Sequence, residues 1–70
     1  MEEIAIHTSF IKLDALMKFS ALAESGGEAK QLIGEGLVKV NGEVCLQRGK
    51  KIFPGDKISF DGQTVRVTKD

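Results

Sequence analysis

The sequence predicts an α+β fold, with two or three short helices packed on a small antiparallel sheet of short strands. Apolar side chains recur at helical spacing in the first half of the chain and then alternate with polar ones from Leu37 onward. The dipeptides Asn-Gly at 41–42 and Asp-Gly at 61–62, which favour tight hairpin turns, interrupt the alternating part. Because the helical segments precede the strands instead of alternating with them, this order favours α+β over a parallel α/β sheet.

Two elements are predicted in the first part of the chain. Residues 4–6 alternate in character and predict a short strand. Residues 11–19 predict a helix, because Leu13, Leu16 and Met17 fall at positions i, i+3 and i+4 and form one apolar stripe. This stripe should face the core, and the lysines outside it should reach solvent.

A second helix is predicted after a glycine pair. Ser25 and Glu28 have the Ser-x-x-Glu spacing of a capping box, in which each side chain bonds the backbone amide of the other residue. Ala29, Leu32 and Ile33 then form the buried face. Glycines at positions 34 and 36 should end the helix, because glycine takes the left-handed conformation at little cost.

The rest of the chain predicts three to five short strands. Residues 38–40 and 43–46 should form one hairpin around the Asn-Gly turn, and residues 57–60 and 63–68 a second one around the Asp-Gly turn. Pro-Gly-Asp at 54–56 fits a tight turn with proline at its second position. The polar stretch 47–51 is predicted to be a loop, and 52–53 is a short apolar segment.

Length and charge set bounds on the function. Seventy residues leave room for a single domain, residues 1–70, with a small core. The ten basic and ten acidic residues cancel overall. Their distribution is uneven, because residues 1–35 hold six acids against three lysines, whereas residues 36–60 hold five bases against two acids. A local positive field can therefore form where the second group gathers.

Location is predicted from the cysteine content and the start of the chain. The one cysteine, Cys45, leaves no internal disulfide, whereas small secreted domains usually carry several. No apolar run approaches the roughly 20 residues that span a bilayer. The acidic start Met-Glu-Glu-Ile lacks the basic leader of a signal peptide. We therefore expect a cytoplasmic protein without a membrane partner, and a monomer.

No motif in the sequence singles out a catalytic or metal site. His7 and Cys45 are the one histidine and the one cysteine, and a Cys–His nucleophile pair would need an orienting third group that nothing suggests. A metal site needs three or four ligands at suitable spacing. We expect His7 at the surface, Cys45 as a half-buried apolar residue, and neither enzyme activity nor a cofactor.

Two motifs indicate anion binding instead. Gly26 and Gly27 open the second predicted helix and leave its exposed amides accessible to a phosphate, with Lys30 on the same helix. Residues 48–51, Arg-Gly-Lys-Lys, place three cations in four positions, and such cations neutralise phosphates and release counterions. The alternatives are a flexible connector at the glycines and a solvated loop at residues 48–51.

Four strings in order carry a family resemblance: Ile-Lys-Leu-Asp-Ala-Leu at 11–16, Ser-Gly-Gly-Glu-Ala-Lys-Gln-Leu-Ile at 25–33, Gly-Leu-Val-Lys-Val-Asn-Gly at 36–42 and Pro-Gly-Asp-Lys-Ile at 54–58. Together they resemble the RNA-binding domain named after small-subunit ribosomal protein S-four, also called the alpha-L motif, over residues 11–60. Lys12 and Gly26 stand where the family usually has arginine; lysine keeps the charge but loses the planar fork. The glycine pair and the basic loop are similar to the small stand-alone YaaA/YbcJ-type members.

The resemblance implies a partner, which is ribosomal RNA or another structured RNA, bound through phosphates during ribosome assembly or maturation, on the ribosome or its assembly intermediates. We read the four phenylalanines mainly as core, so recognition should follow RNA shape more than stacking on bases. The alternative is a protein–protein interaction module without direct RNA contact, which zero net charge and exposed strand edges would suit. The expected RNA contacts are Lys12, Gly26, Gly27, Lys30, Lys39, Arg48, Lys50 and Lys51.

Overall fold

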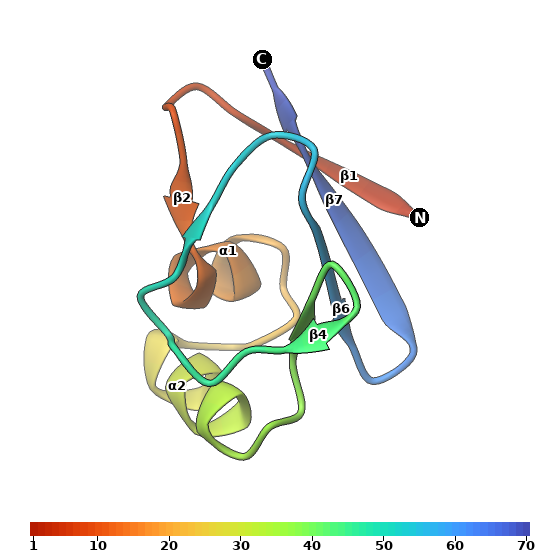
Figure 1. The fold of residues 1–70 in the computed structure, drawn as a ribbon. Coiled ribbons are helices and arrows are strands. Elements are labelled where there is room, and N and C mark those ends of the chain that lie inside the picture. Colours follow the sequence, from red (N-terminus) through yellow and green to blue (C-terminus); the bar gives the residue numbers. More distant parts are fainter.

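The computed structural model describes all 70 residues and contains two helices and seven strands (Figure 1). Five strands form one sheet in the order β1-β7-β6-β3-β4, and β2 and β5 form a separate two-stranded ladder. The elements are β1 (Glu2–Ile6), β2 (Ile11–Lys12), α1 (Leu13–Phe19), α2 (Gly26–Gly34), β3 (Lys39–Val40), β4 (Glu43–Val44), β5 (Lys51–Ile52), β6 (Lys57–Phe60) and β7 (Gln63–Lys69).

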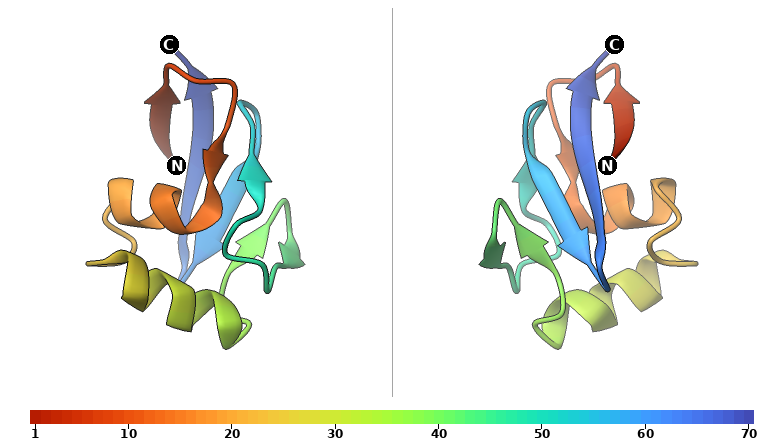
Figure 2. Two further views of the ribbon diagram at one scale, coloured as in Figure 1. Left: turned by 90° about the vertical axis from the view of Figure 1, so that its left-hand side faces the viewer. Right: turned by 90° about the vertical axis from the view of Figure 1, so that its right-hand side faces the viewer.

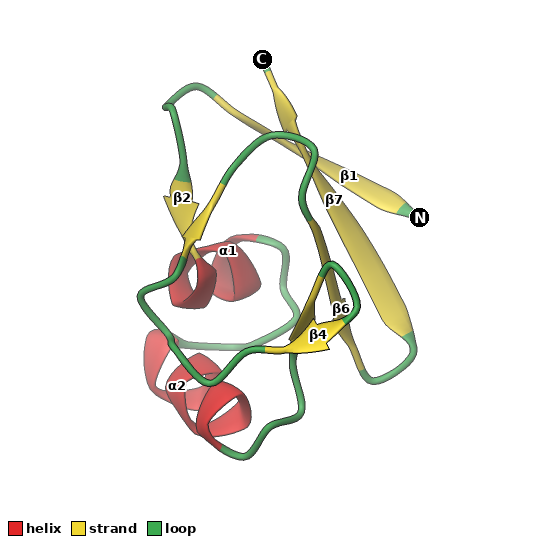
Figure 3. Ribbon diagram, in the orientation of Figure 1, coloured by secondary structure: helices red, strands yellow, loops and turns green.

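The predicted α+β class is confirmed, with one difference in the sheet. β6 pairs antiparallel with β7 and with β3, but β1 runs parallel to β7, with Ile4 opposite Val67. The sheet is therefore mixed rather than wholly antiparallel. The two helices gather on one side of the long strands, as the colours of Figure 3 show. Both helices fall short of the length and apolar character that a membrane crossing requires.

The core lies between the helices and the sheet, where the predicted stripes meet. Leu13, Leu16 and Met17 of α1 are fully buried, which confirms the i, i+3, i+4 pattern. The helix begins at Leu13, two residues later than predicted, because Ile11 and Lys12 pair with β5 instead. One hydrophobic cluster joins this stripe to the inner side chains of α2 and the sheet, including Ala29, Ile33, Val40, Ile58, Val65 and Val67.

Helix α2 begins and ends with the signals that the sequence predicted. The Ser25 hydroxyl accepts a hydrogen bond from the Glu28 amide at 3.1 Å. The Glu28 carboxylate accepts from the amide of Glu24 at 3.3 Å, one residue before the expected partner. Gly36 has a φ of +77°, and the amides of Gly36 and Leu37 donate to the carbonyls of Ile33 and Leu32. This is a Schellman ending, for which glycine is favoured.

Two turns that look independent in the sequence are joined by side-chain hydrogen bonds. Asn41 has a φ of 53° in the first hairpin turn. Its amide nitrogen Nδ2 donates to Asp56 Oδ1, and its Oδ1 accepts from the Lys57 amide, both at 3.0 Å. Asp56 Oδ2 also accepts from the Phe53 amide at 2.8 Å. The Asn-Gly hairpin and the Pro-Gly-Asp turn therefore form one unit, although 15 positions separate Asn41 from Asp56.

Candidate nucleic-acid interface

The basic loop at residues 47–50 is attached to the start of α1 by its backbone. The first amides of a helix have no partner within the helix, and the Lys12 side chain does not cap α1. Instead, the Leu13 amide donates to the Lys50 carbonyl at 2.9 Å, and the Asp14 amide donates to the Arg48 carbonyl at 3.0 Å. These two carbonyls cap the helix, so the loop is held in place and its side chains are left for other contacts.

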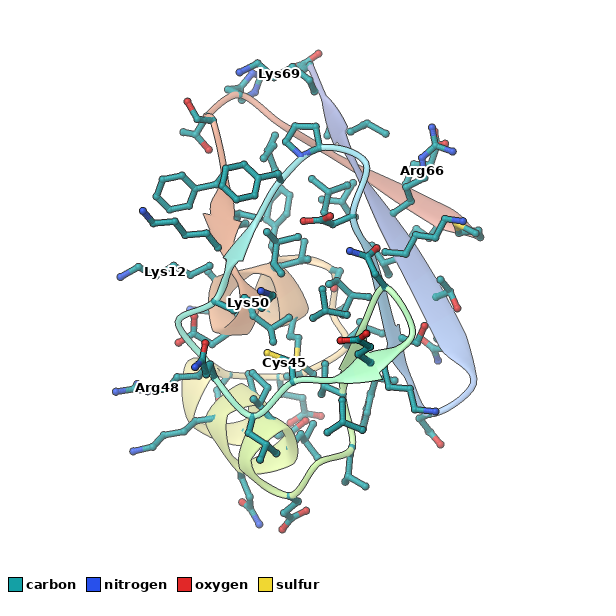
Figure 4. All side chains as sticks on the ribbon, in the orientation of Figure 1. Lys12, Cys45, Arg48, Lys50, Arg66 and Lys69 are labelled. Atoms are coloured by element: carbon teal, nitrogen blue, oxygen red, sulfur yellow. The ribbon has the colours of Figure 1, made fainter.

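The ladder of β2 and β5 adds two more cations beside this loop. Ile11 pairs with Ile52, and Lys12 pairs with Lys51. Ile52 is fully buried, whereas Lys12 and Lys51 are both exposed. Cross-strand partners of this kind have Cβ atoms about 4.5–5.5 Å apart. We call Lys12, Arg48, Lys50 and Lys51 the basic cluster. In Figure 4, Lys12 and Arg48 extend to the left of the view and Lys50 lies nearer its middle.

The basic cluster is free of ion pairs. The structure contains a single one, between His7 Nδ1 and Asp70 Oδ2 at 3.0 Å, near the chain ends. Asp14 is the one acidic residue in the segments that build the cluster, and its Oδ1 accepts from the Ala15 amide at 2.8 Å. The four cations are exposed and have no carboxylate partner, so their charge is available to an anion.

The start of α2 is open, but the fold does not require glycine there. The amides of Gly26 and Gly27 donate to no protein acceptor. Neither residue has a positive φ. A Cβ at Gly26 would meet nothing within 4 Å, and one at Gly27 would meet only the Ser25 hydroxyl at 3.8 Å. Packing therefore does not explain the glycine pair, whereas close approach of an anion to a bare helix start would.

The glycine pair and the basic cluster lie apart. In the left panel of Figure 2, α2 starts at the left of the helical layer, whereas the loop after β4 lies at the right, beside the start of α1. Lys30 is exposed on α2. The structure thus offers one open helix start, at α2, and separately the basic cluster, which lies beside a helix start whose amides are already capped.

Lys39 lies on the other face of the sheet. Its neighbour Val40 points into the core, so Lys39 points outward, opposite Ser59 of β6. Lys57 and Arg66 are register partners on this same outer face. We call Lys39, Lys57 and Arg66 the outer row. Of the eight expected contact residues, the structure brings together Lys12, Arg48, Lys50 and Lys51, places Gly26, Gly27 and Lys30 on α2, and separates Lys39 from both groups.

The prediction that the phenylalanines belong to the core is wrong for three of them, because only Phe60 packs against it. Phe19 and Phe53 are 64% and 48% exposed. Phe60 packs partly against the core, and Phe10 is half-buried next to Phe53. The sequence pattern could not show which phenylalanines are exposed, because it counts every phenylalanine as apolar whether it is buried or not.

The one histidine and the one cysteine do not meet. Cys45 is buried, as part of the core cluster, and its Sγ lies 3.6 Å from the Gln47 carbonyl. The hollow that it lines is formed with residues 40–50 and does not include His7, which is exposed and paired with Asp70. The geometry offers no Cys–His pair.

Comparison with known proteins gives consistent matches along the chain. A family model described as S4 domain matches residues 4–68. YbcJ of Escherichia coli is 42% identical over 57 residues, which cover 81% of each protein. Its solution structure, described as revealing an alpha-L motif involved in RNA binding, matches with a TM-score of 0.75 and 36% identity, covering 97% of this chain and 87% of that one.

Two further relatives differ from each other in length. A Bacillus subtilis protein named "Probable ribosome maturation protein RlbA" is 37% identical over 59 residues, covering 84% of this chain and 83% of that protein. An RNA pseudouridine synthase of Aquifex aeolicus is 37% identical over 60 residues, which are 86% of this chain and 25% of the enzyme. The same sequence unit therefore occurs in proteins of similar size and within a longer enzyme.

Proposed function

The chain belongs to the S4 domain family, and from this premise we propose that it binds structured RNA through phosphate contacts of the basic cluster. The description of the YbcJ structure and the name of RlbA support RNA as the partner and ribosome maturation as the setting. We further propose ribosomal RNA as the target, bound in the cytoplasm by a monomer that acts as one domain. The chain is similar to only a quarter of the pseudouridine synthase, which fits a unit that binds RNA and has no catalytic activity of its own.

One observation carries the proposal: cations from two distant segments converge on the start of α1 with no carboxylate paired to them. Lys12 comes from β2, Lys51 from β5, and Arg48 and Lys50 from the loop that caps α1. The loop is held by backbone hydrogen bonds, so little chain entropy is lost when its side chains meet RNA. Arg48 can engage a phosphate through two parallel hydrogen bonds, whereas the lysines act as point charges.

The start of α2 supplies a second phosphate contact in this proposal. The bare amides of Gly26 and Gly27 form the positive end of the helix, and Lys30 lies one turn further along. Because this start lies apart from the basic cluster, the two would hold separate phosphates of one folded RNA. Such contacts position the RNA and carry little sequence information.

The salt dependence of binding tests the electrostatic mechanism. A labelled synthetic RNA stem-loop is titrated with the protein, and fluorescence anisotropy gives the dissociation constant between roughly 50 and 200 mM salt. If four or five phosphates are engaged, log affinity should fall against log salt with a slope of about −3 to −4. A flat response would exclude the basic cluster as the binding surface.

The ribosomal target needs a cellular test. Crosslinking the protein to RNA in cells and sequencing the attached fragments should enrich ribosomal RNA over its abundance in an uncrosslinked control. A profile equal to that control would leave the RNA-binding chemistry intact but refute the target.

A protein–protein interaction module is the second candidate, because apolar side chains are exposed near the edge strand β4. Val44 and Leu46 are 54% and 64% exposed and border Gly36 at the end of α2. Exposed apolar side chains beside a strand edge suit a protein partner. The two candidates separate in a pull-down with nuclease treatment, in which a partner retained after RNA removal favours the protein module.

A further inference from the structure

Two phenylalanines form a pair outside the core, in which Phe53 is exposed and Phe10 is half-buried. The ring centroids of Phe10 and Phe53 are 6.0 Å apart, and their planes are inclined by 49°. This is a favourable arrangement for aromatic rings. Phe53 is 48% exposed, and neither ring belongs to the core cluster or packs against it. The pair therefore presents aromatic surface to solvent without a part in holding the core together.

The fold fixes Phe53 in position. Its amide donates to Asp56 Oδ2 at 2.8 Å, and its carbonyl accepts from the Asp56 amide at 3.0 Å. Asp56 is bonded to Asn41, and the Gly55 amide donates to the Val67 carbonyl at 2.8 Å, which ties the turn to the sheet. These bonds hold the backbone that carries the ring, so a flat ligand that covers the ring orders little of the main chain.

The aromatic pair adjoins the basic cluster. Lys51 Nζ lies 4.9 Å from the centroid of the Phe10 ring, within the range of a cation–π contact. Lys51 is also the cross-strand partner of Lys12. An aromatic face and two cations thus stand side by side, which matches the chemistry of a nucleotide with its flat base and its anionic phosphate.

We propose that the Phe10–Phe53 pair is a stacking site for one unpaired base of the bound RNA, with Lys51 and Lys12 on the adjacent phosphates. The inference rests on the proposed function and deepens it. Phosphate contacts alone recognise the shape of an RNA helix, whereas an unpaired base can leave the stack and lie on an aromatic ring. The protein should therefore prefer a helix that carries a bulged or splayed nucleotide over a continuous duplex.

The absence of tryptophan and tyrosine permits a direct optical test. Phe53→Trp introduces a single indole at the proposed site. Leu37→Trp is the matched control, because Leu37 is exposed to the same degree, 50% against 48%, but borders Lys39 of the outer row. Each variant is titrated with a synthetic stem-loop containing one bulged adenosine and with the same stem fully paired. Stacking predicts quenching of the F53W emission by the bulged RNA alone, and no change for L37W.

Affinity gives the second measurement. Phe53→Leu keeps an apolar side chain but removes the aromatic face, so binding of the bulged stem-loop should weaken about tenfold while binding of the paired stem is unchanged. Phe53→Tyr should restore the affinity. Circular dichroism confirms that each variant is folded.

The outcomes separate this inference from the proposed function. The stacking site is refuted if the protein and F53L each bind the bulged and the paired RNA equally and the F53W emission does not distinguish the two RNAs. The proposal that the basic cluster binds phosphates is then unaffected. If neither RNA binds with a salt-dependent affinity, the proposed function fails first, and the stacking site fails with it.

Discussion

The basic cluster and the outer row carry similar charge but are built differently. The outer row comes from three neighbouring strands of a regular sheet, with Ser59 between its members and Glu3 of β1 in register beside Arg66. The basic cluster comes from a two-residue ladder and a loop whose carbonyls cap α1, and it has no ion pair. A count of cations separates the two surfaces little, with four in the basic cluster and three in the outer row. Neither surface has an ion pair, so the attachment of the loop to a helix start distinguishes them.

Removing three charges from each surface should give the largest difference in RNA affinity between them. The triple change Arg48→Gln, Lys50→Gln and Lys51→Gln should weaken RNA binding on the order of 100-fold at physiological salt, because about three phosphate contacts are lost. The slope of log affinity against log salt should become shallower by about 3, because about three fewer counterions are released. Fluorescence anisotropy with the labelled stem-loop measures both quantities.

The outer row supplies the matched control for that experiment. Lys39→Gln, Lys57→Gln and Arg66→Gln also remove two lysines and one arginine, here from exposed positions of the outer row. This variant should bind within about twofold of the unchanged protein, since long-range charge is largely screened at this salt concentration. Equal losses in both variants would mean that net charge, and not the cluster, governs binding.

The Asn41–Asp56 network should have the next largest effect, on stability. Asp56→Ala removes the acceptor of the Asn41 side chain and of the Phe53 amide, and should lower the free energy of unfolding by about 2 kcal/mol. Urea denaturation measures the change. Glu43→Ala is the control, because Glu43 is exposed and its side chain makes no hydrogen bond, so its effect should stay within about 0.5 kcal/mol. A stable D56A variant would mean that backbone bonds alone hold the turns.

This network illustrates what the sequence could and could not predict. The Ser25 cap, the Schellman glycine and both hairpin turns are local signals, and the sequence predicts each of them. The bond between Asn41 and Asp56 joins two turns that local patterns present as separate. Periodicity indicates which face of an element is buried, but it does not indicate which elements become neighbours.

The same limit applies to the candidate site. The charges at residues 48–51 could be read directly, but the capping of α1 by the carbonyls of Arg48 and Lys50 joins segments more than 30 positions apart and has no sequence signature. The short ladder of β2 and β5 is equally non-local, so Lys12 and Lys51 were expected in a helix and a loop. Lys39 could not be separated from them, because its exposure resembles theirs and only the sheet order shows which face it occupies.

The glycine pair allows stability and binding to be separated. Gly26→Ala with Gly27→Ala should raise the free energy of unfolding by up to about 1 kcal/mol, because both positions are helical and have room for a Cβ. RNA affinity should fall about fivefold, since the methyl groups hinder close approach to the helix start. Thermal unfolding and anisotropy measure the two effects.

The other end of α2 provides the control for the glycine pair. Gly34 is exposed and helical, and a Cβ there would meet nothing within 4 Å. Gly34→Ala should therefore stabilise the protein to a similar extent per residue without changing RNA affinity. If the change at the start of α2 also leaves affinity unaltered, the second phosphate contact does not exist and the basic cluster acts alone.

The smallest expected effect concerns the kind of cation at the cluster. Lys12→Arg introduces the planar fork that the family usually carries here, and a guanidinium beside Lys51 can hold a phosphate with two parallel hydrogen bonds. RNA affinity should rise roughly two- to threefold, because one point-charge contact becomes a directed one. Lys39→Arg on the outer row should leave it unchanged. A rise in both variants would place RNA on both faces of the sheet, and no rise in either would mean that Lys12 acts through charge alone, without a fixed geometry at the phosphate.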